Sequence, residues 1–187
     1  MSNIKLYVLS CMFPLLVSAC ASNGYYDDYG MPPLPQQQPA AAPRVAANYE
    51  SRMPQHISTG EKTVLVDPNV HAWGAYSADG NLIRAGLATA GSDWCDDLGR
   101  PCRTRSGSFR IQSLGDAGCK STRYPLPHGG APMPYCMFFN GNLALHGSQY
   151  VMEANASHGC VRMDVQDAEW MRYNFANIGT KVIIRSY

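Results

Sequence analysis

The sequence predicts a mostly-β domain, a β-sandwich or barrel-like fold with one or two helices. From residue 61 onward, short apolar runs rich in β-branched and aromatic residues alternate with turn residues. The dipeptides Asp79-Gly80 and Asn140-Gly141 each stand between two such runs, which is a strong hairpin signal. Only one segment has a helical pattern. Since the chain has 187 residues, one domain is expected.

The strands expected from these runs are short and are spread over the whole domain. They cover residues 62–67, 71–76, 81–89, 107–112, 135–139, 143–146 and 180–184. The single helical segment begins after Asp164, whose side chain can cap its first turn, and continues through Phe175. Ile178-Gly179 then ends it.

The first 19 residues have the features of a secretory signal. Residues 6–17 are apolar apart from Ser10, a stretch too short to span a bilayer as a mature helix. The segment ends in Leu-Val-Ser-Ala-Cys20, which resembles the lipobox of bacterial lipoproteins, and Cys20 would then carry the lipid. Ala21 resembles the residue that accompanies outer-membrane sorting. We therefore expect a membrane anchor on the periplasmic side of the envelope, with plain secretion as the alternative.

Residues 20–60 have the composition of a tether. They are rich in Pro, Gln and Ala and show no sustained apolar period. Such a segment buries too little surface to offset its ordering entropy. The sequence thus predicts a disordered linker over residues 20–60 and a catalytic domain over residues 61–187.

Cysteine usage supports export. With Cys20 lipidated and Cys160 kept for chemistry, the chain after the signal retains an even set of four, and these are Cys95, Cys102, Cys119 and Cys136. Four cysteines allow three pairings. The spacing favours Cys95 with Cys102 and Cys119 with Cys136, but scattered buried thiols are an alternative. The formal charge of +1 gives no reason to expect nucleic acid as a partner.

Residues 157–162, Ser-His-Gly-Cys-Val-Arg, carry the clearest chemical signal, together with the upstream pair His146-Gly147. Cysteine attacks as the thiolate, so a neighbouring imidazole that takes its proton activates it. A glycine beside Cys160 avoids crowding the sulfur and permits a tight turn that can aim N–H groups at an oxyanion. The pattern indicates acyl transfer by a cysteine nucleophile.

These two motifs resemble the catalytic signature of the L,D-transpeptidase (YkuD-type) domain family. The resemblance covers roughly residues 62–184. Residues 103–109, Arg-Thr-Arg-Ser-Gly-Ser-Phe, are similar to the family's Thr-Pro-x-Gly-x-Phe element, with Arg105 at the position where proline is usual. The interval between His146 and Cys160 is shorter than in many members.

The resemblance implies a role for each matched residue. Cys160 would be the nucleophile and His146 the base, oriented by a backbone carbonyl near Gly147. His158 would be a third catalytic residue, which shapes the site and its hydrogen bonding. The backbone groups of Gly159 and Gly147, with the N–H of Cys160, are implied as oxyanion or positioning groups. Arg162 and Ser157 are implied as substrate-binding residues, because a guanidinium pairs well with a carboxylate.

The resemblance implies a monomeric enzyme without metal or other cofactor. Its substrate would be a peptidoglycan stem peptide, which acylates Cys160 and is then transferred to an amine. Water as the acceptor would make the chain an L,D-carboxypeptidase, and the same groove could serve a non-catalytic peptidoglycan-binding lipoprotein. A cysteine peptidase of another class is less favoured, since such enzymes usually place the cysteine before the histidine. A zinc site built on His146, His158 and Cys160 lacks a fourth ligand at suitable spacing.

Overall fold

The computed structural model describes residues 48–187. The predicted signal peptide, Cys20 and most of the predicted tether lie outside the described residues. Within residues 48–187, no helix combines the length and the apolar character that a membrane crossing requires.

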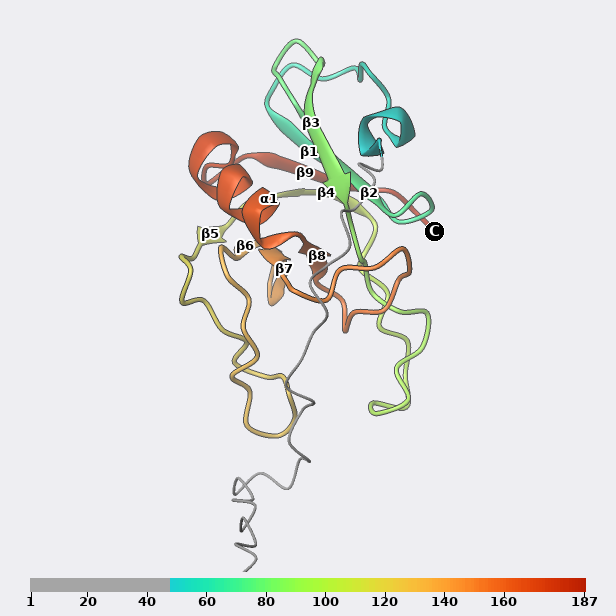
Figure 1. The fold of residues 1–187 in the computed structure, drawn as a ribbon, viewed down its shortest axis with the longest axis vertical. Helices are drawn as coiled ribbons and strands as arrows, with labels where there is room; N and C mark the ends of the chain where they lie inside the picture. Colours follow the sequence, from blue (N-terminus) through green and yellow to red (C-terminus); the bar gives the residue numbers. More distant parts are fainter. Residues whose placement is uncertain (1–47) are drawn as a thin grey trace, which may run out of the picture. The chain divides into compact units, whose positions relative to one another are not determined.

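A five-stranded sheet forms one layer of the domain, in the order β3-β2-β1-β9-β4. β1 (Thr63–Asp67) pairs antiparallel with β2 (Ala72–Tyr76), which pairs antiparallel with β3 (Leu82–Leu87). On its other side β1 pairs parallel with β9 (Lys181–Ile184), and β4 (Gly107–Arg110) closes that edge antiparallel to β9. Figure 1 shows these strands crossing the upper part of the domain.

A four-stranded sheet forms the second layer, in the order β5-β6-β7-β8. β5 (Ser113–Leu114) and β7 (Leu143–Gly147) both pair antiparallel with β6 (Met137–Asn140). β7 then pairs parallel with β8 (Val161–Met163), the strand that directly follows Cys160. This parallel pair places the two sequence motifs next to each other.

The helix and the main core complete the domain. α1 (Val165–Trp170) begins where Asp164 accepts a hydrogen bond from the N–H of Gln166, and it continues into the π-helical turn η2 (Met171–Phe175). The main hydrophobic cluster contains side chains from both sheets and from α1 and η2. Its largest fully buried members include Trp73, Ile111, Met137, Phe139, Leu145, Met163 and Met171. The mostly-β prediction with a single helical segment is confirmed.

The described part of the chain already packs onto the sheet ahead of residue 61, the predicted start of the domain. A 3-10 turn, η1 (Tyr49–Arg52), precedes Met53, which is 4% exposed and packs with Tyr76 and its neighbours. The Tyr76 hydroxyl donates to the carbonyl of Pro54 at 2.9 Å. The apolar side chains in this segment are widely spaced, so only tertiary packing reveals them.

Two disulfides close the long loops of the domain. Cys95 is joined to Cys102 in the loop between β3 and β4, and Cys119 to Cys136 in the loop between β5 and β6. This is the pairing that the spacing favours. We call residues 95–102 the first disulfide loop and residues 119–136 the second disulfide loop. Both extend from the lower end of the strands in Figure 1, where β7 and β8 also lie.

Candidate active site

Two short parallel strands place the predicted reactive side chains on one face of the sheet. His146 of β7 is the register partner of Arg162 of β8, and Cys160 lies one residue before β8. Side chains alternate between faces along a strand, so His146, Cys160 and Arg162 share a face. Leu145, which precedes His146, and Val161, which lies between Cys160 and Arg162, are fully buried in the main core on the opposite face. A thiol, an imidazole and a guanidinium are thereby collected at one site.

The three side chains line one pocket of about 780 Å³. This is within the usual range for small-molecule sites, about 300–1,000 Å³. Much of the remaining wall comes from Arg100 in the first disulfide loop, from residues 120–124 and 131–134 in the second, and from residues 148–150 after β7. The pocket is therefore enclosed mainly by loops around a base of strands.

The backbone orients the His146 imidazole. Its Nδ1 lies 2.8 Å from the carbonyl oxygen of Gly147, and because a carbonyl only accepts hydrogen bonds, Nδ1 carries the proton. Nε2 then keeps the lone pair of a base. Burial of the ring, which is 5% exposed, lowers the pKa of His146 to about 4, and the charge of Arg162 acts in the same direction. At neutral pH the imidazole is therefore uncharged and able to accept a proton.

The Cys160 thiol is half-buried, and among residues 48–187 it is the only free cysteine. Its Sγ lies 3.7 Å from the carbonyl oxygen of Asn142, a weak hydrogen bond that only the protonated thiol can donate. Burial raises the pKa of the thiol, and the N–H of Ala144 and the charge of Arg162 offset part of this effect. A neutral thiol thus shares the pocket with a neutral imidazole, so a thiolate forms when a base takes the proton.

A tight turn holds Cys160 in place. Gly159 has a φ of 118°, which other residues rarely adopt, and a Cβ there would lie 3.0 Å from Leu143 Cδ2. The buried hydroxyl of Ser157 accepts from the N–H of Gly159 at 3.1 Å and donates to the carbonyl of Cys160. Ser157 therefore fixes the turn from inside, and its only hydroxyl proton is already used. Ser157 also lines the pocket, and its predicted substrate contact stays a prediction.

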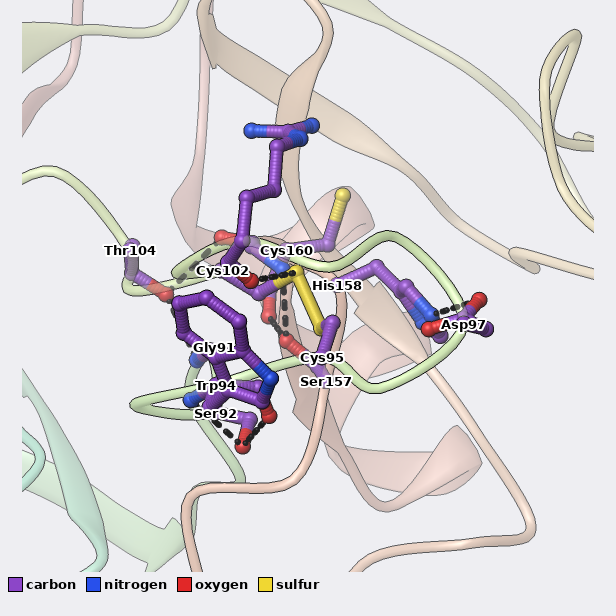
Figure 2. The surroundings of a disulfide bond; sticks show 12 residues. Gly91, Ser92, Trp94, Cys95, Asp97, Cys102, Thr104, Ser157, His158 and Cys160 are labelled. Carbon is purple, nitrogen blue, oxygen red and sulfur yellow. Dashed lines mark hydrogen bonds and ion pairs between the residues drawn. A yellow bond between two sulfur atoms is a disulfide. The ribbon is translucent and has the colours of Figure 1, made fainter.

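A polar network that the sequence did not predict supports the turn through the carbonyl of Gly159. The Thr104 hydroxyl donates to the carbonyl of Gly159 at 2.8 Å and accepts from the N–H of Gly91 at 2.9 Å. The Tyr187 hydroxyl donates to the carbonyl of Gly91 and accepts from the N–H of Thr104, both at 2.8 Å. Figure 2 shows Thr104 and Gly91 beside the turn. Thr104 opens the Thr-x-x-Gly-x-Phe element, which is the signal that could have found it, whereas Tyr187 has no comparable signal.

The close approach at Gly91 gives a prediction about stability. A Cβ at this position would lie 2.0 Å from the carbonyl oxygen of Cys102 and 2.6 Å from the amide nitrogen of Thr104. Gly91→Ala should therefore destabilise the domain by about 2 kcal/mol or more, because backbone atoms have to move. Gly60→Ala is the matched control, since nothing lies within 4 Å of a Cβ there. Urea unfolding measures both; equal stability of the two variants would contradict the prediction.

His158 extends away from the sulfur of Cys160 (Figure 2). Its Nε2 lies 2.8 Å from Asp97 Oδ2, and its ring centroid lies 4.6 Å from that of Tyr124. Asp97 belongs to the first disulfide loop and Tyr124 to the second, so His158 connects the two loops. With Nε2 engaged by a carboxylate, this geometry favours a positioning role over the predicted catalytic role.

The predicted oxyanion groups are only partly available. The N–H of Gly159 is bonded to Ser157, and the N–H of Gly147 donates to the carbonyl of Pro134 at 2.8 Å. The Gly159 amide has a partner in this structure, so its role as an oxyanion donor stays a prediction. Gly147 acts through its carbonyl, on His146. Of these three predicted groups, the amide of Cys160 remains as the candidate oxyanion donor.

One group of potential metal ligands lies next to the site: Cys95, Asp97 and His158 have ligand atoms within 4.8 Å of one another. Cys95 is bonded to Cys102, so its sulfur is not a thiolate. Two donors remain, fewer than the three protein ligands of a typical catalytic zinc site. The donor chemistry of this group therefore does not fit zinc.

The family model of the L,D-transpeptidase catalytic domain, YkuD, matches residues 61–184, more than half of the chain. The chain belongs to this family. An L,D-transpeptidase from Xylanimonas cellulosilytica shares 26% sequence identity with it, with a TM-score of 0.61 over 71% of this chain and 64% of that one. The chain thus spans slightly less than two thirds of that L,D-transpeptidase structure.

Two further L,D-transpeptidases share the fold. The one from Mycobacterium smegmatis is 22% identical, with a TM-score of 0.55, and covers 67% of this chain and 59% of that one. L,D-transpeptidase 3 from Mycobacterium tuberculosis, solved with a faropenem-derived adduct, is 21% identical, with a TM-score of 0.54 and coverage of 67% and 60%. A search of curated proteins gave no match.

Proposed function

We propose that this L,D-transpeptidase domain transfers acyl groups of peptidoglycan stem peptides through a thioester on Cys160. The observation that carries the proposal is the free thiol of Cys160 in one pocket with His146, whose Nε2 is left unprotonated by the bond from Nδ1 to Gly147. Family membership supports the reaction class.

In the acylation step, His146 Nε2 accepts the thiol proton while Sγ attacks the carbonyl carbon of the scissile amide. The oxyanion is assigned to the amide N–H of Cys160, within the turn that Ser157 and Thr104 hold. Collapse of the intermediate breaks the C–N bond, and the imidazolium returns its proton to the leaving amine. Arg162, half-buried in the same pocket, is the proposed partner of a substrate carboxylate.

In the second step an acceptor amine attacks the thioester, gives up a proton through His146, and releases the thiol. An amine acceptor forms a crosslink, attaches a protein or exchanges a D-amino acid, whereas water would trim the peptide. The direct test incubates the domain with defined tetrapeptide muropeptides and analyses the products by mass spectrometry. Crosslinked dimers or exchanged D-amino acids support transpeptidation; tripeptides alone would indicate carboxypeptidase activity, and unchanged substrate would contradict both.

We also propose that a lipid on Cys20 anchors the domain to the periplasmic side of a membrane. The motif around Cys20 and the two disulfides of the domain, which need an oxidising compartment, support this. In an envelope-containing bacterial host, Cys20→Ala should move the protein from the membrane fraction to the soluble fraction, because the acyl chains are lost. Fractionation with a high-salt wash measures this, and Cys11→Ala is the matched control. A Cys20→Ala protein that still sediments with membranes after the wash would exclude the lipid anchor.

A further inference from the structure

The active-site pocket is lined by cations and by no carboxylate. Its positively charged lining residues are Arg100, Lys120, Arg123 and Arg162, and among residues 48–187 no Asp or Glu side chain contributes to the wall. Arg162 is half-buried beside Cys160, whereas the other three are exposed. The pocket therefore concentrates positive charge in a protein whose overall formal charge is only +1.

Among residues 48–187, none of these four cations has a carboxylate oxygen within 4.0 Å. Six Lys and Arg side chains of residues 48–187 form ion pairs within 4.0 Å, and none of these six lines the pocket. The acidic side chains in and just before the first disulfide loop do not supply partners either. Asp97 pairs with His158, Asp93 pairs with Arg103, and Asp96 forms no ion pair within 4.0 Å among residues 48–187. Cations without carboxylate partners around one cavity favour anionic ligands.

The loops that carry these cations are fixed at both ends. Arg100 lies in the first disulfide loop, and Lys120 and Arg123 lie in the second. The contacts of His158 with Asp97 and Tyr124 connect the two loops at the edge of the pocket. The disulfides and these contacts restrict the loops before any ligand arrives. Binding therefore loses less conformational entropy of the loops.

We propose that Arg100, Lys120 and Arg123 form a carboxylate-recognition site that works together with Arg162. The pocket then selects acidic peptides with several free carboxylates over the same peptides with amidated carboxylates. This inference rests on the proposed function, because it specifies the substrate class of the same pocket. Each exposed pair contributes modestly, so selectivity comes from three cations acting together.

Binding to a Cys160→Ser protein separates recognition from turnover. Calorimetry compares a synthetic stem tetrapeptide carrying free carboxylates with the same peptide amidated at its internal carboxylates. We expect the amidated peptide to bind roughly tenfold more weakly at low salt, with a smaller difference as salt rises. Adding Lys120→Gln and Arg123→Gln should lower the affinity for the free-carboxylate peptide by about the same factor and leave that for the amidated peptide nearly unchanged.

Arg105→Gln is the matched control, since Arg105 is exposed, has no ion-pair partner among residues 48–187 and lies outside the pocket. Initial rates of the wild-type domain on both peptides give a second measurement that needs no Cys160 variant. Equal affinities and rates for the two peptides, or an equal loss in Arg105→Gln, would overturn the recognition site even if turnover is normal. A clear preference for the free carboxylates in a protein without turnover would support the site and refute the acyl-transfer proposal.

Discussion

Replacing Cys160 by alanine should abolish acyl transfer while leaving the domain folded. Removal of a catalytic nucleophile typically lowers kcat by about 10⁴-fold or more. The fold should tolerate the change because the half-buried sulfur makes only weak polar contacts, with the backbone of Asn142 and Ala144, and packs at the edge of the small cluster around Met133. We expect a stability loss of about 1 kcal/mol, well below the cost of a large core deletion. Muropeptide turnover and thermal unfolding together measure both effects.

The same variant tests the covalent intermediate. Incubation of the wild-type domain with a carbapenem or penem should add the mass of one acyl group, located on Cys160 by peptide mapping, and the Cys160→Ala protein should show no addition. The four cysteines in disulfides act as internal controls, because they have no free thiol to acylate. An adduct that persists in Cys160→Ala, or turnover close to the wild-type rate, would remove Cys160 as the nucleophile.

Much of the fold follows from local sequence signals. The two hairpin turns and the capped helix depend on short-range chemistry, and the strands around them lie close to their predicted positions. β5 and β8 were not predicted, because each has only two or three residues and is defined by its pairing with β6 or β7. A strand of this length has too few residues to show an alternation.

At the site, too, some residues could be predicted from local sequence and others only from tertiary contacts. Cys160 and His146 stand in a motif, so the sequence could assign them before any coordinates. The amide of Gly159 could not be judged in this way, because only the turn shows that Ser157 already accepts its hydrogen bond. Likewise, Arg100 and Lys120 lie far from Cys160 in sequence, and the disulfide loops bring them to the same pocket.

Replacing His146 by glutamine should slow acyl transfer by about 10²- to 10⁴-fold, the usual contribution of a general base. Burial raises the pKa of the thiol, so Cys160 has little thiolate of its own and depends on the base. Because the pKa of His146 is lowered to about 4, the wild-type enzyme should also keep most of its kcat at pH 5, where an ordinary imidazole is largely protonated. A wild-type rate that falls with a midpoint near pH 6.5, or a His146→Gln rate close to that of the wild type, would contradict this role.

The buried imidazole also makes folding stability depend on pH, with a direction that follows from its pKa. The pKa of His146 is about 4 in the folded protein and 6.5 in an exposed imidazole, so between these values the unfolded chain binds more protons. Stability is therefore fully present above pH 6.5 and is lost as pH falls toward 4, by about 3 kcal/mol for a shift of this size. Urea unfolding of the wild type and of His146→Gln at pH 7 and at pH 4 measures the effect. The free energy of unfolding lost between the two pH values is compared between the two proteins, so that the contributions of other titrating groups cancel. His128→Gln, at an exposed position, controls for the substitution itself. If the wild type and His146→Gln lose the same stability between pH 7 and pH 4, the imidazole is not held neutral by burial, and the proton acceptor proposed for Cys160 loses its physical basis.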